Sequence, residues 1–304
     1  MAILKDWLKG TEYKLLNGTD ECEVNDVVFD SRKAAPDTVF LCMCGSKTDS
    51  HDFIPDVLSK GCKTFVVEKA LLDLKLSEEE LKDINIIFTE NARKTLAYLA
   101  AARFDHPADK LKLIGLTGTK GKTSTSYMFK AVFDKCGIKA GVIGTNGVVI
   151  GDEQFEIKNT TPDSYDLNSY FYRMLEAGCE YVVMECSSQG FKMNRTDALS
   201  FDYGVFLNIS PDHIGPLEHA DFDEYLYCKS RLFTQCDTAV VNADDEHTDE
   251  LMKLAEFRGK QYRFSIADKD ADLNAHELRF RTSADFAGTV FDTNGLINNE
   301  FSLG

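Results

Sequence analysis

Short apolar runs alternate with helical patterns along the first hundred or so residues. The apolar runs are too short for buried helices and are bounded by polar residues, which is typical of strands. Between them, apolar residues recur at helical spacing over residues 53–60 and 92–104. This alternation predicts a small α/β domain over residues 1–107. The predicted strands cover residues 27–29, 39–42, 64–67 and 84–89.

A second alternation of strands and helices starts at Leu111. Just before it, Pro107 disfavours helix at His106, so residues 104–109 are interpreted as a linker. Strands that alternate with helices predict a mainly parallel sheet with helices on both faces, here in a domain over residues 108–304. The predicted strands cover residues 112–116, 141–143, 181–184, 204–207 and 238–242, and the clearest helices 124–135, 166–176 and 221–233.

The pattern changes from about Ala271 to the end of the chain. Short strand-like stretches follow one another there, and no helical spacing separates them. The sequence Asp292-Thr-Asn-Gly295 is typical of a turn. We therefore expect antiparallel strands in this last part.

Charge and composition limit the classes of protein to which this chain can belong. Hydrophobic residues make up 43% of the chain, which is enough for a sizeable core. Acidic residues outnumber basic ones by 50 to 34, whereas a nucleic-acid binder needs a basic surface. No apolar run approaches the roughly 18–20 residues of a membrane span, and the polar N-terminus does not resemble a signal peptide. We expect a cytoplasmic protein with no nucleic-acid partner, no membrane insertion and, lacking any CxxC pair, no zinc site.

The strongest local motif is Gly118-Thr-Lys-Gly-Lys-Thr123, which lies between a predicted strand and a predicted helix. Its glycines let backbone amides turn toward phosphate oxygens, and a helix N-terminus adds partial positive charge. Lys122 would reach the β- and γ-phosphates of a nucleotide, and Thr123 would bind Mg²⁺. The longer phosphate-loop pattern is not met, because Leu116 stands where it requires glycine. The alternative is a glycine turn that caps a helix and binds no ligand.

A carboxylate follows one of the predicted buried strands. Glu185 comes directly after the apolar run 181–184. Ligands of open α/β sheets bind at the carboxyl ends of the strands, and Mg²⁺ prefers oxygen ligands. Glu185 is therefore a candidate metal ligand.

Five stretches, taken in order, resemble the Mur ligases, and most closely the MurE type. The segment Asn159-Thr-Thr-Pro162 favours the MurE type over the MurF type, which carries a glycine- and asparagine-rich segment at this point. The other four are Phe29-Asp-Ser-Arg32, the Gly118–Thr123 loop, Glu185-Cys-Ser-Ser-Gln-Gly190, and Asn208-Ile-Ser-Pro-Asp-His213 with the helix from Tyr225 to Lys229.

The resemblance implies a site for UDP-MurNAc-dipeptide. In this family the N-terminal domain binds the uridine diphosphate part of that substrate. Ser50 departs from the family pattern, which usually has glycine there. Without the resemblance, Arg195 would be interpreted as part of a surface ion pair. The paired threonines would be interpreted as the N-cap of a helix. The implied substrate-binding residues are Ser31, Ser46, Lys47, Thr48, Thr160, Thr161, Ser187 and Arg195.

The resemblance also implies a site for ATP and Mg²⁺. Lys229 matches a family lysine that reacts with CO₂ to form a carbamate, which replaces a cation by a carboxylate-like metal ligand. A lone lysine of this kind is ordinarily a solvated surface charge, and a lone histidine such as His213 is ordinarily structural. Lys120, where MurE members commonly have asparagine, points either at solvent or toward the phosphates. The implied ATP-binding residues are Gly118, Thr119, Lys120, Gly121, Lys122, Thr123 and Ser124, the metal ligands Thr123, Glu185, His213 and Lys229, and the catalytic residues Lys122, His213 and Lys229.

The activity implied is ATP-dependent amide-bond formation in peptidoglycan synthesis. ATP would phosphorylate the D-glutamyl carboxylate of UDP-MurNAc-L-Ala-D-Glu, and the amine of meso-diaminopimelate or L-lysine would attack the acyl phosphate. The protein would act as a monomer. Because the family has a third, C-terminal Rossmann-like domain, we expect that this chain lacks it and is a fragment. The alternatives are another ligase of the superfamily, of the MurF or folylpolyglutamate type, and a nucleotide-binding module without turnover.

Overall fold

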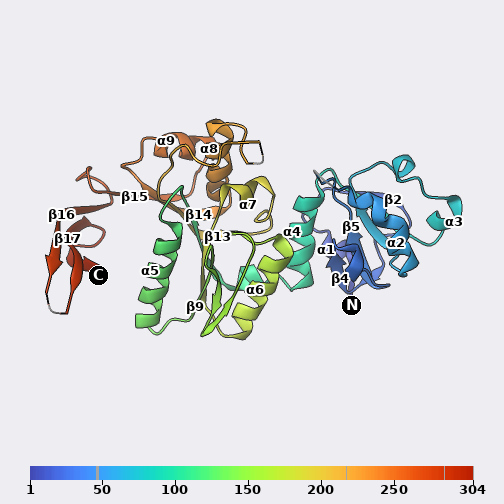
Figure 1. Cartoon of the computed structure of the whole chain (residues 1–304), viewed down its shortest axis with the longest axis horizontal. Helices are drawn as coiled ribbons and strands as arrows, with labels where there is room; N and C mark the ends of the chain where they lie inside the picture. Colours follow the sequence, from blue (N-terminus) through green and yellow to red (C-terminus); the bar gives the residue numbers. More distant parts are fainter. Residues whose placement is uncertain (46–47, 217, 284, 304) are drawn as a thin grey trace. The chain divides into compact units, whose positions relative to one another are not determined.

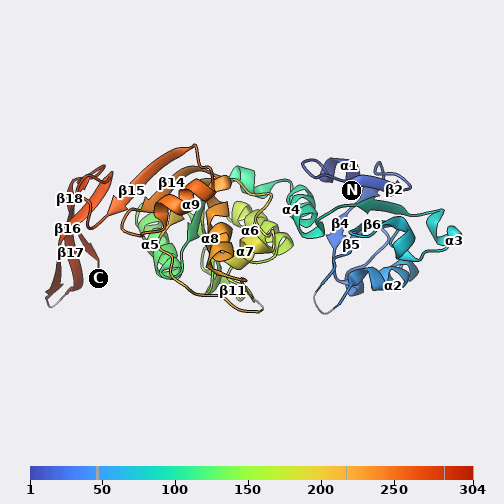
Figure 2. The same cartoon turned by 90° about the horizontal axis from the view of Figure 1, so that it is seen from above.

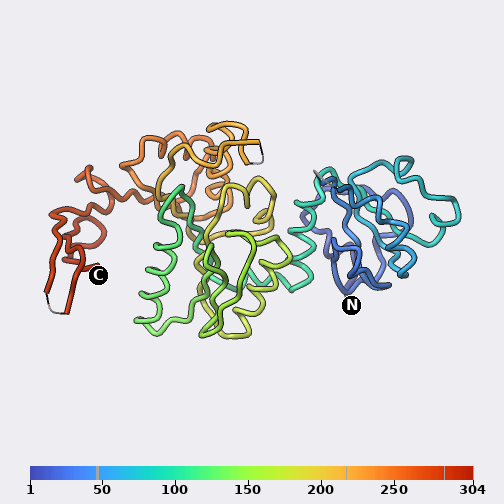
Figure 3. Tube along the Cα trace, viewed as in Figure 1, coloured from blue at the N-terminus to red at the C-terminus, as the bar shows by residue number. Residues whose placement is uncertain are grey.

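The computed structural model describes residues 1–45, 48–216, 218–283 and 285–303 (Figure 1; Figure 3 traces the chain). They form two compact units. The first consists of Met1–Lys110, Pro162–Leu175 and Met193–Leu199, and the second of Leu111–Thr161, Glu176–Lys192 and Ser200–Gly304. No helix of the described residues is long and apolar enough to cross a membrane.

The first unit is built on a five-stranded sheet. Its strand order is β2-β7-β6-β5-β4, with β2 antiparallel to β7 and the other neighbours parallel. The four strands expected from apolar runs are confirmed, whereas the more polar β2 was not predicted. The sheet strands are β2 (Lys14–Asn17), β4 (Asp26–Val28), β5 (Thr38–Leu41), β6 (Thr64–Val67) and β7 (Asn85–Phe88). β1 (Ala2–Ile3) pairs with β3 (Glu23–Val24), and the helices are α1 (Leu4–Trp7), α2 (Ile54–Ser59), α3 (Glu78–Leu81) and α4 (Ala92–Arg103).

Both faces of this sheet are covered, which explains why its inner strands are apolar throughout. Successive side chains of a strand point to opposite faces. Val39 and Leu41 accordingly join the core cluster with α1 and α4, while Phe40 joins the cluster with α2. The continuous apolar runs thus predicted a buried sheet correctly.

The second unit is built on an eleven-stranded mixed sheet, seen from two directions in Figures 1 and 2. Its order is β11-β10-β9-β12-β8-β13-β14-β15-β16-β17-β18, and the run from β9 to β16 is parallel. The central strands are β8 (Lys112–Thr117), β9 (Ala140–Gly144), β12 (Tyr181–Glu185), β13 (Phe201–Phe206), β14 (Cys236–Asn242) and β15 (Lys260–Ser265). The others are β10 (Gly147–Ile150), β11 (Glu153–Phe155), β16 (Leu273–Thr282), β17 (Ala287–Gly295) and β18 (Asn299–Leu303).

Alternate residues of β8 show how this sheet is packed. Ile114 and Leu116 lie in a cluster with Phe129 of α5, so they face that helix. On the opposite face, a Cβ at Gly115 would lie 2.7 Å from the Leu232 side chain, so only glycine admits that close approach. The helices of the second unit are α5 (Lys122–Lys135), α7 (Ser188–Lys192), α8 (Phe222–Ser230) and α9 (Thr248–Leu254), all labelled in Figure 1. α6 (Ser164–Glu176) belongs to the first unit except for its last residue.

Three features of the second unit differ from the sequence predictions. The antiparallel hairpin β10–β11 was not predicted. The helix expected over 221–233 ends at Ser230 and continues as a 3₁₀ helix, Arg231–Thr234. The turn expected at Asp292–Gly295 is wrong, because these residues are the end of β17, where Thr293 pairs with β16 and β18 on either side. The antiparallel arrangement itself is confirmed.

Candidate functional site

The Gly118–Thr123 motif lies where the sequence placed it, between a strand and a helix. β8 ends at Thr117 and α5 begins at Lys122. Gly121, the residue before the helix, has φ +86°, a conformation that side chains rarely adopt. Because the first backbone N–H groups of a helix have no partner in the preceding turn, the start of α5 offers donors to an anion.

The loop is fixed by the segment after β13. The Thr119 N–H donates to the Asn208 carbonyl at 2.9 Å, and the Lys120 N–H donates to the Asn208 side chain at 3.0 Å. The Thr119 hydroxyl lies 3.0 Å from the hydroxyl of Tyr225 on α8. The amides of residues 119 and 120 are therefore used inside the protein, and the donors left for phosphate are those at the start of α5.

Two lysines that are distant in sequence meet at one carbonyl oxygen of this loop. The Nζ atoms of Lys122 and Lys229 donate to the Gly118 carbonyl at 2.6 and 2.9 Å. Burial lowers the pKa of Lys122. Burial, and then the positive charge of Lys122, lower the pKa of Lys229 well below its usual value. Lys229 is 1% exposed, so it is not a solvated surface charge.

Lys120 does not turn toward this pair. Its Nζ lies 3.2 Å from the Asp212 carboxylate, and its side chain is exposed. Of the two alternatives left open by the sequence, the exposed side chain agrees with the one that points at solvent, and there it forms an ion pair with Asp212.

Glu185 is buried at the carboxyl end of β12 and held by Thr145. The Thr145 N–H donates to Oε1 at 3.0 Å, and its hydroxyl donates to Oε2 at 3.2 Å. A Cβ at Gly144 would lie 2.1 Å from Oε1, so the carboxylate occupies space that only glycine leaves. Sequence reasoning missed Thr145; its position two residues after the predicted strand 141–143, which pairs with the strand that ends in Glu185, was the available signal.

The paired threonines differ in what their hydroxyls do. Thr161 is fully buried, donates to the Glu185 carbonyl at 3.0 Å and accepts from the Ser187 N–H at 2.9 Å. Ser187 Oγ lies 3.0 Å from the Thr161 hydroxyl. Thr160 is only half-buried, and its hydroxyl lies 3.0 Å from that of Thr145. Thr160 is thus the member of the pair that remains accessible.

His213 lies in the loop before α8. It is exposed, has φ +55° and shares a hydrogen bond of 2.9 Å between its Nδ1 and Glu218. Sequence reasoning overlooked His219, which is fully buried, packs against the Tyr225 ring and shares a hydrogen bond of 2.8 Å with Ser188. His219 therefore ties this loop to α7.

The remaining predicted substrate residues belong to the first unit. Ser31 starts a 3₁₀ helix, and its carbonyl accepts from Lys60 at 2.9 Å. The Thr48 carbonyl accepts from the Gly45 N–H at 3.1 Å. Arg195 forms an ion pair with Asp163 at 3.0 Å, the kind of contact considered as its alternative from sequence; the arginine side chain is largely buried, whereas that of Asp163 is 40% exposed. Ser46 and Lys47 lie outside the described residues.

One group of possible metal ligands stands out among the described residues, namely Cys44, Asp49 and His51 in the first unit. His51 Nε2 accepts from the Glu68 N–H at 3.0 Å, so its Nδ1 carries the proton and donates to Asp49 at 2.6 Å. Burial and the nearby Asp49 charge raise the pKa of the Cys44 thiol. Both ring nitrogens of His51 are thus used in hydrogen bonds that hold the loop around Asp49.

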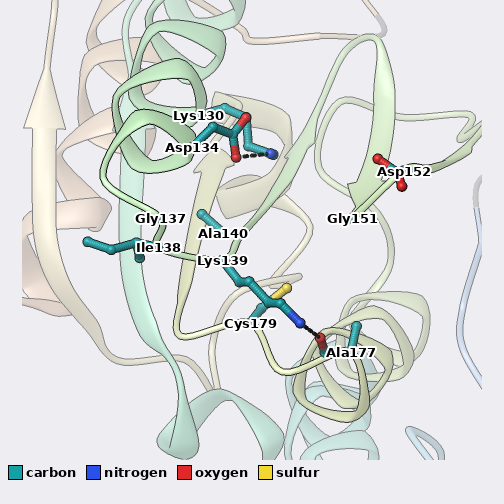
Figure 4. A pocket seen from close by; sticks show the side chains of 10 residues that line it. All are labelled: Lys130, Asp134, Gly137, Ile138, Lys139, Ala140, Gly151, Asp152, Ala177 and Cys179. Atoms are coloured by element: carbon teal, nitrogen blue, oxygen red, sulfur yellow. Dashed lines mark hydrogen bonds and ion pairs between the residues drawn. The ribbon is translucent and has the colours of Figure 1, made fainter.

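A cavity of about 400 Å³, whose lining residues are drawn in Figure 4, includes Ala140 at the start of β9 and Cys179 just before β12, whereas Glu185 lies at the other end of β12. Both lysines that line it already have partners: Lys130 lies 2.5 Å from Asp134, and Lys139 donates to the Ala177 carbonyl at 3.3 Å (Figure 4). None of the described residues predicted to bind ATP or substrate lines it.

Residues 116–302 match the model of the Mur ligase middle domain. The chain belongs to the Mur ligase family. This confirms the resemblance drawn from its motifs, and the matched region contains the Gly118–Thr123 loop, Glu185, His213 and Lys229.

Individual Mur ligases are similar over almost all of the chain. A ligase of Clostridium perfringens named UDP-N-acetylmuramoyl-L-alanyl-D-glutamate–2,6-diaminopimelate ligase is 36% identical over 99% of the chain, which spans 60% of that relative. A solved structure with the same enzyme name matches 92% of the chain and 55% of its own length, with a TM-score of 0.77 at 23% identity. The MurF ligase of Thermotoga maritima, solved in complex with ADP, matches with a TM-score of 0.56 at 17% identity, over 92% of this chain and 58% of its own. These structures show the shared fold.

Proposed function

We propose that this chain carries the nucleotide and UDP-sugar sites of a MurE-type ligase. The reaction joins a diamino acid to UDP-MurNAc-L-Ala-D-Glu at the expense of ATP. The observation that carries the proposal is the meeting of Lys122 and Lys229 at the Gly118 carbonyl, inside a loop of the Gly-Thr-Lys-Gly-Lys-Thr type. The names of the similar ligases favour meso-diaminopimelate over L-lysine as the amino acid. ATP and UDP-linked substrates place the reaction in the cytoplasm.

ATP binds at the start of α5. The N–H groups at residues 121–124 and the Lys122 amine offer donors and positive charge to the β- and γ-phosphates. Burial favours the neutral amine at Lys122, and a polyphosphate brings negative charge that reverses this preference. Lys122 then leaves the Gly118 carbonyl for the phosphates and offsets charge that develops as the phosphoryl group moves to the D-glutamyl carboxylate.

The residues near the loop fit Mg²⁺. Glu185 supplies a buried carboxylate, Thr123 a hydroxyl, and His213 a ring nitrogen, and the first two are oxygen ligands of the kind that Mg²⁺ prefers. Burial lowers the pKa of Lys229 and so favours its neutral amine, the form that reacts with CO₂ to give a carbamate. Bound Mg²⁺ would neutralise phosphate charge. Thr123, Glu185, His213 and carbamylated Lys229 are the proposed ligands.

The proposal assigns the parts of the UDP-sugar substrate to separate groups of residues in the chain. Residues 1–107 form its uridine diphosphate domain, with Ser31 and the loop at 46–48, and residues 108–304 form the ATPase domain. Arg195 and Ser187 contact the acidic peptide or the sugar, and a planar guanidinium suits a carboxylate. The ligase works as a monomer.

Calorimetry tests the proposal without requiring turnover. The chain is titrated with UDP-MurNAc-L-Ala-D-Glu, with UDP-MurNAc-L-Ala as the control, and Arg195→Ala is titrated in parallel. We expect binding that needs the D-Glu residue and weakens about tenfold in the variant. A folded sample that binds ATP but neither UDP compound would instead be a phosphate-loop module with another substrate, of the folylpolyglutamate type or without ligase activity.

A further inference from the structure

Three side chains form a hydrogen-bonded line from the surface to the buried carboxylate at the end of β12. Thr160 Oγ lies 3.0 Å from Thr145 Oγ, and Thr145 Oγ lies 3.2 Å from Glu185 Oε2. Glu185 is 1% exposed, whereas Thr160 is half-buried. The outer end of the line is therefore the one that a ligand can reach.

The direction of each hydrogen bond follows from counting protons. A carboxylate only accepts, and a hydroxyl has one proton and two lone pairs. The single proton of Thr145 is therefore used on Glu185. Only Thr160 has a proton left for the bond between the two hydroxyls, so Thr160 donates to Thr145.

This direction decides what Thr160 presents to a ligand. Its proton points inward, and its two lone pairs are the part left for hydrogen bonding. The neighbouring Thr161 has no such capacity, because its hydroxyl already donates to the Glu185 carbonyl and accepts from Ser187. Thr160 can therefore accept a hydrogen bond and cannot donate one while the line is intact.

We propose that Thr145 is a positioning residue that fixes Thr160 as a pure acceptor, so that Thr160 selects a peptide N–H of the substrate. This rests on the proposed function and adds Thr145 and the direction of recognition to it. A carboxylate or carbonyl group of the substrate, which needs a donor, is not taken by Thr160. Through two hydrogen bonds in series, the buried carboxylate of Glu185 thereby makes the Thr160 hydroxyl an acceptor.

The test uses two analogues of UDP-MurNAc-L-Ala-D-Glu, each methylated at one of its two peptide nitrogens. Methylation removes one donor. We expect one analogue to bind the wild-type chain about tenfold more weakly than the parent, measured by calorimetry without Mg²⁺. In Thr160→Val, which loses the acceptor, parent and analogue should bind equally. Equal binding of parent and both analogues by the wild-type chain overturns the inference.

Thr145→Val tests the positioning role separately. This variant keeps the backbone N–H on Glu185 but frees the proton of Thr160, so Thr160 can both donate and accept. We expect the ratio of analogue to parent dissociation constants to fall severalfold, and Thr145→Ser, which keeps the hydroxyl, to restore it. A merely structural role would weaken parent and analogue together and leave the ratio unchanged, which counts against the proposal.

Glu185→Gln should reverse the direction in which hydrogen bonds are donated along the line. Its amide can turn and donate to Thr145, which then donates to Thr160, which in turn donates outward. The preference for the parent over the methylated analogue should then disappear, while a preference that persists contradicts the mechanism. If the wild-type chain binds ATP but not the parent compound, the proposed function itself fails and this inference falls with it. Thermal unfolding of each variant checks that it is folded.

Discussion

The side chain of Asn208 is bonded twice to the backbone of Lys120. Its carbonyl oxygen accepts from the Lys120 N–H at 3.0 Å, and its amide nitrogen donates to the Lys120 carbonyl at 3.2 Å. The segment after β13 thereby holds the phosphate loop that follows β8, the neighbour of β13 in the sheet.

Loss of these two hydrogen bonds should loosen the loop. Each hydrogen bond contributes on the order of 1 kcal/mol, so Asn208→Leu should weaken ATP binding by roughly tenfold. Asn298→Leu is a matched control, because the Asn298 side chain makes the same pair of hydrogen bonds, with the N–H and carbonyl of Gly295, in another part of the sheet. Calorimetry with a non-hydrolysable ATP analogue measures both. Equal affinities of the two variants would show that the Asn208 bonds do not shape the site.

Gly144→Ala should disturb Glu185 specifically. The new Cβ would overlap Oε1, so the carboxylate must move at a cost of roughly 1–3 kcal/mol. We expect a clearly weaker Mg²⁺ dependence of ATP-analogue binding with only moderate loss of stability. Gly215→Ala serves as control, since nothing lies within 4 Å of its added Cβ. Unchanged Mg²⁺ dependence in Gly144→Ala would argue against Glu185 as a metal ligand.

Lys229→Met should change how stability depends on pH. Because burial lowers the pKa of Lys229 in the folded chain, the unfolded chain binds one more proton between that lowered pKa and the ordinary value of 10.5. The free energy of unfolding therefore rises with pH across this interval, and the variant should lose that rise. Urea unfolding between pH 6 and 9 in CO₂-free buffer measures it. Lys9→Met, at an exposed lysine, should keep the wild-type slope.

Tyr165→Phe should show the opposite pH behaviour. The Tyr165 hydroxyl donates to Asp26, and burial together with that negative charge raises its pKa to about 12, from 10.0. Between pH 10 and 12 the unfolded chain releases this proton first, so the stabilisation present below pH 10 is lost as pH rises. The stability advantage of wild type over Tyr165→Phe, roughly 1 kcal/mol at neutral pH for a partly exposed bond, should shrink there. An advantage that is constant up to pH 12 would contradict the raised pKa.

The sequence by itself determined the two α/β sheets and the position of the phosphate loop. Buried parallel strands must be apolar on both faces, so runs such as Thr64–Val67 are visible without any structure. Glycine at residue 121 also indicates the turn before α5 from sequence alone, because that turn is left-handed and other residues rarely adopt this conformation. The polar β2 and the strand at Asp292–Gly295 were misjudged because pairing with neighbouring strands, rather than their own residue types, indicates that they are extended. The β10–β11 hairpin was also missed, although β10 is an apolar Gly-Val-Val-Ile run.

Only the tertiary structure decided how the site residues are used. Lys229 looks like an ordinary helix lysine in sequence, and its burial beside Lys122 comes from β8 and α8 meeting at the Gly118 carbonyl. Adjacent Thr160 and Thr161 are chemically identical, yet one is accessible and the other is enclosed by Glu185 and Ser187. Sequence fixes which groups are present, whereas burial and the allocation of each hydrogen-bond proton depend on neighbours that are tens of residues away along the chain.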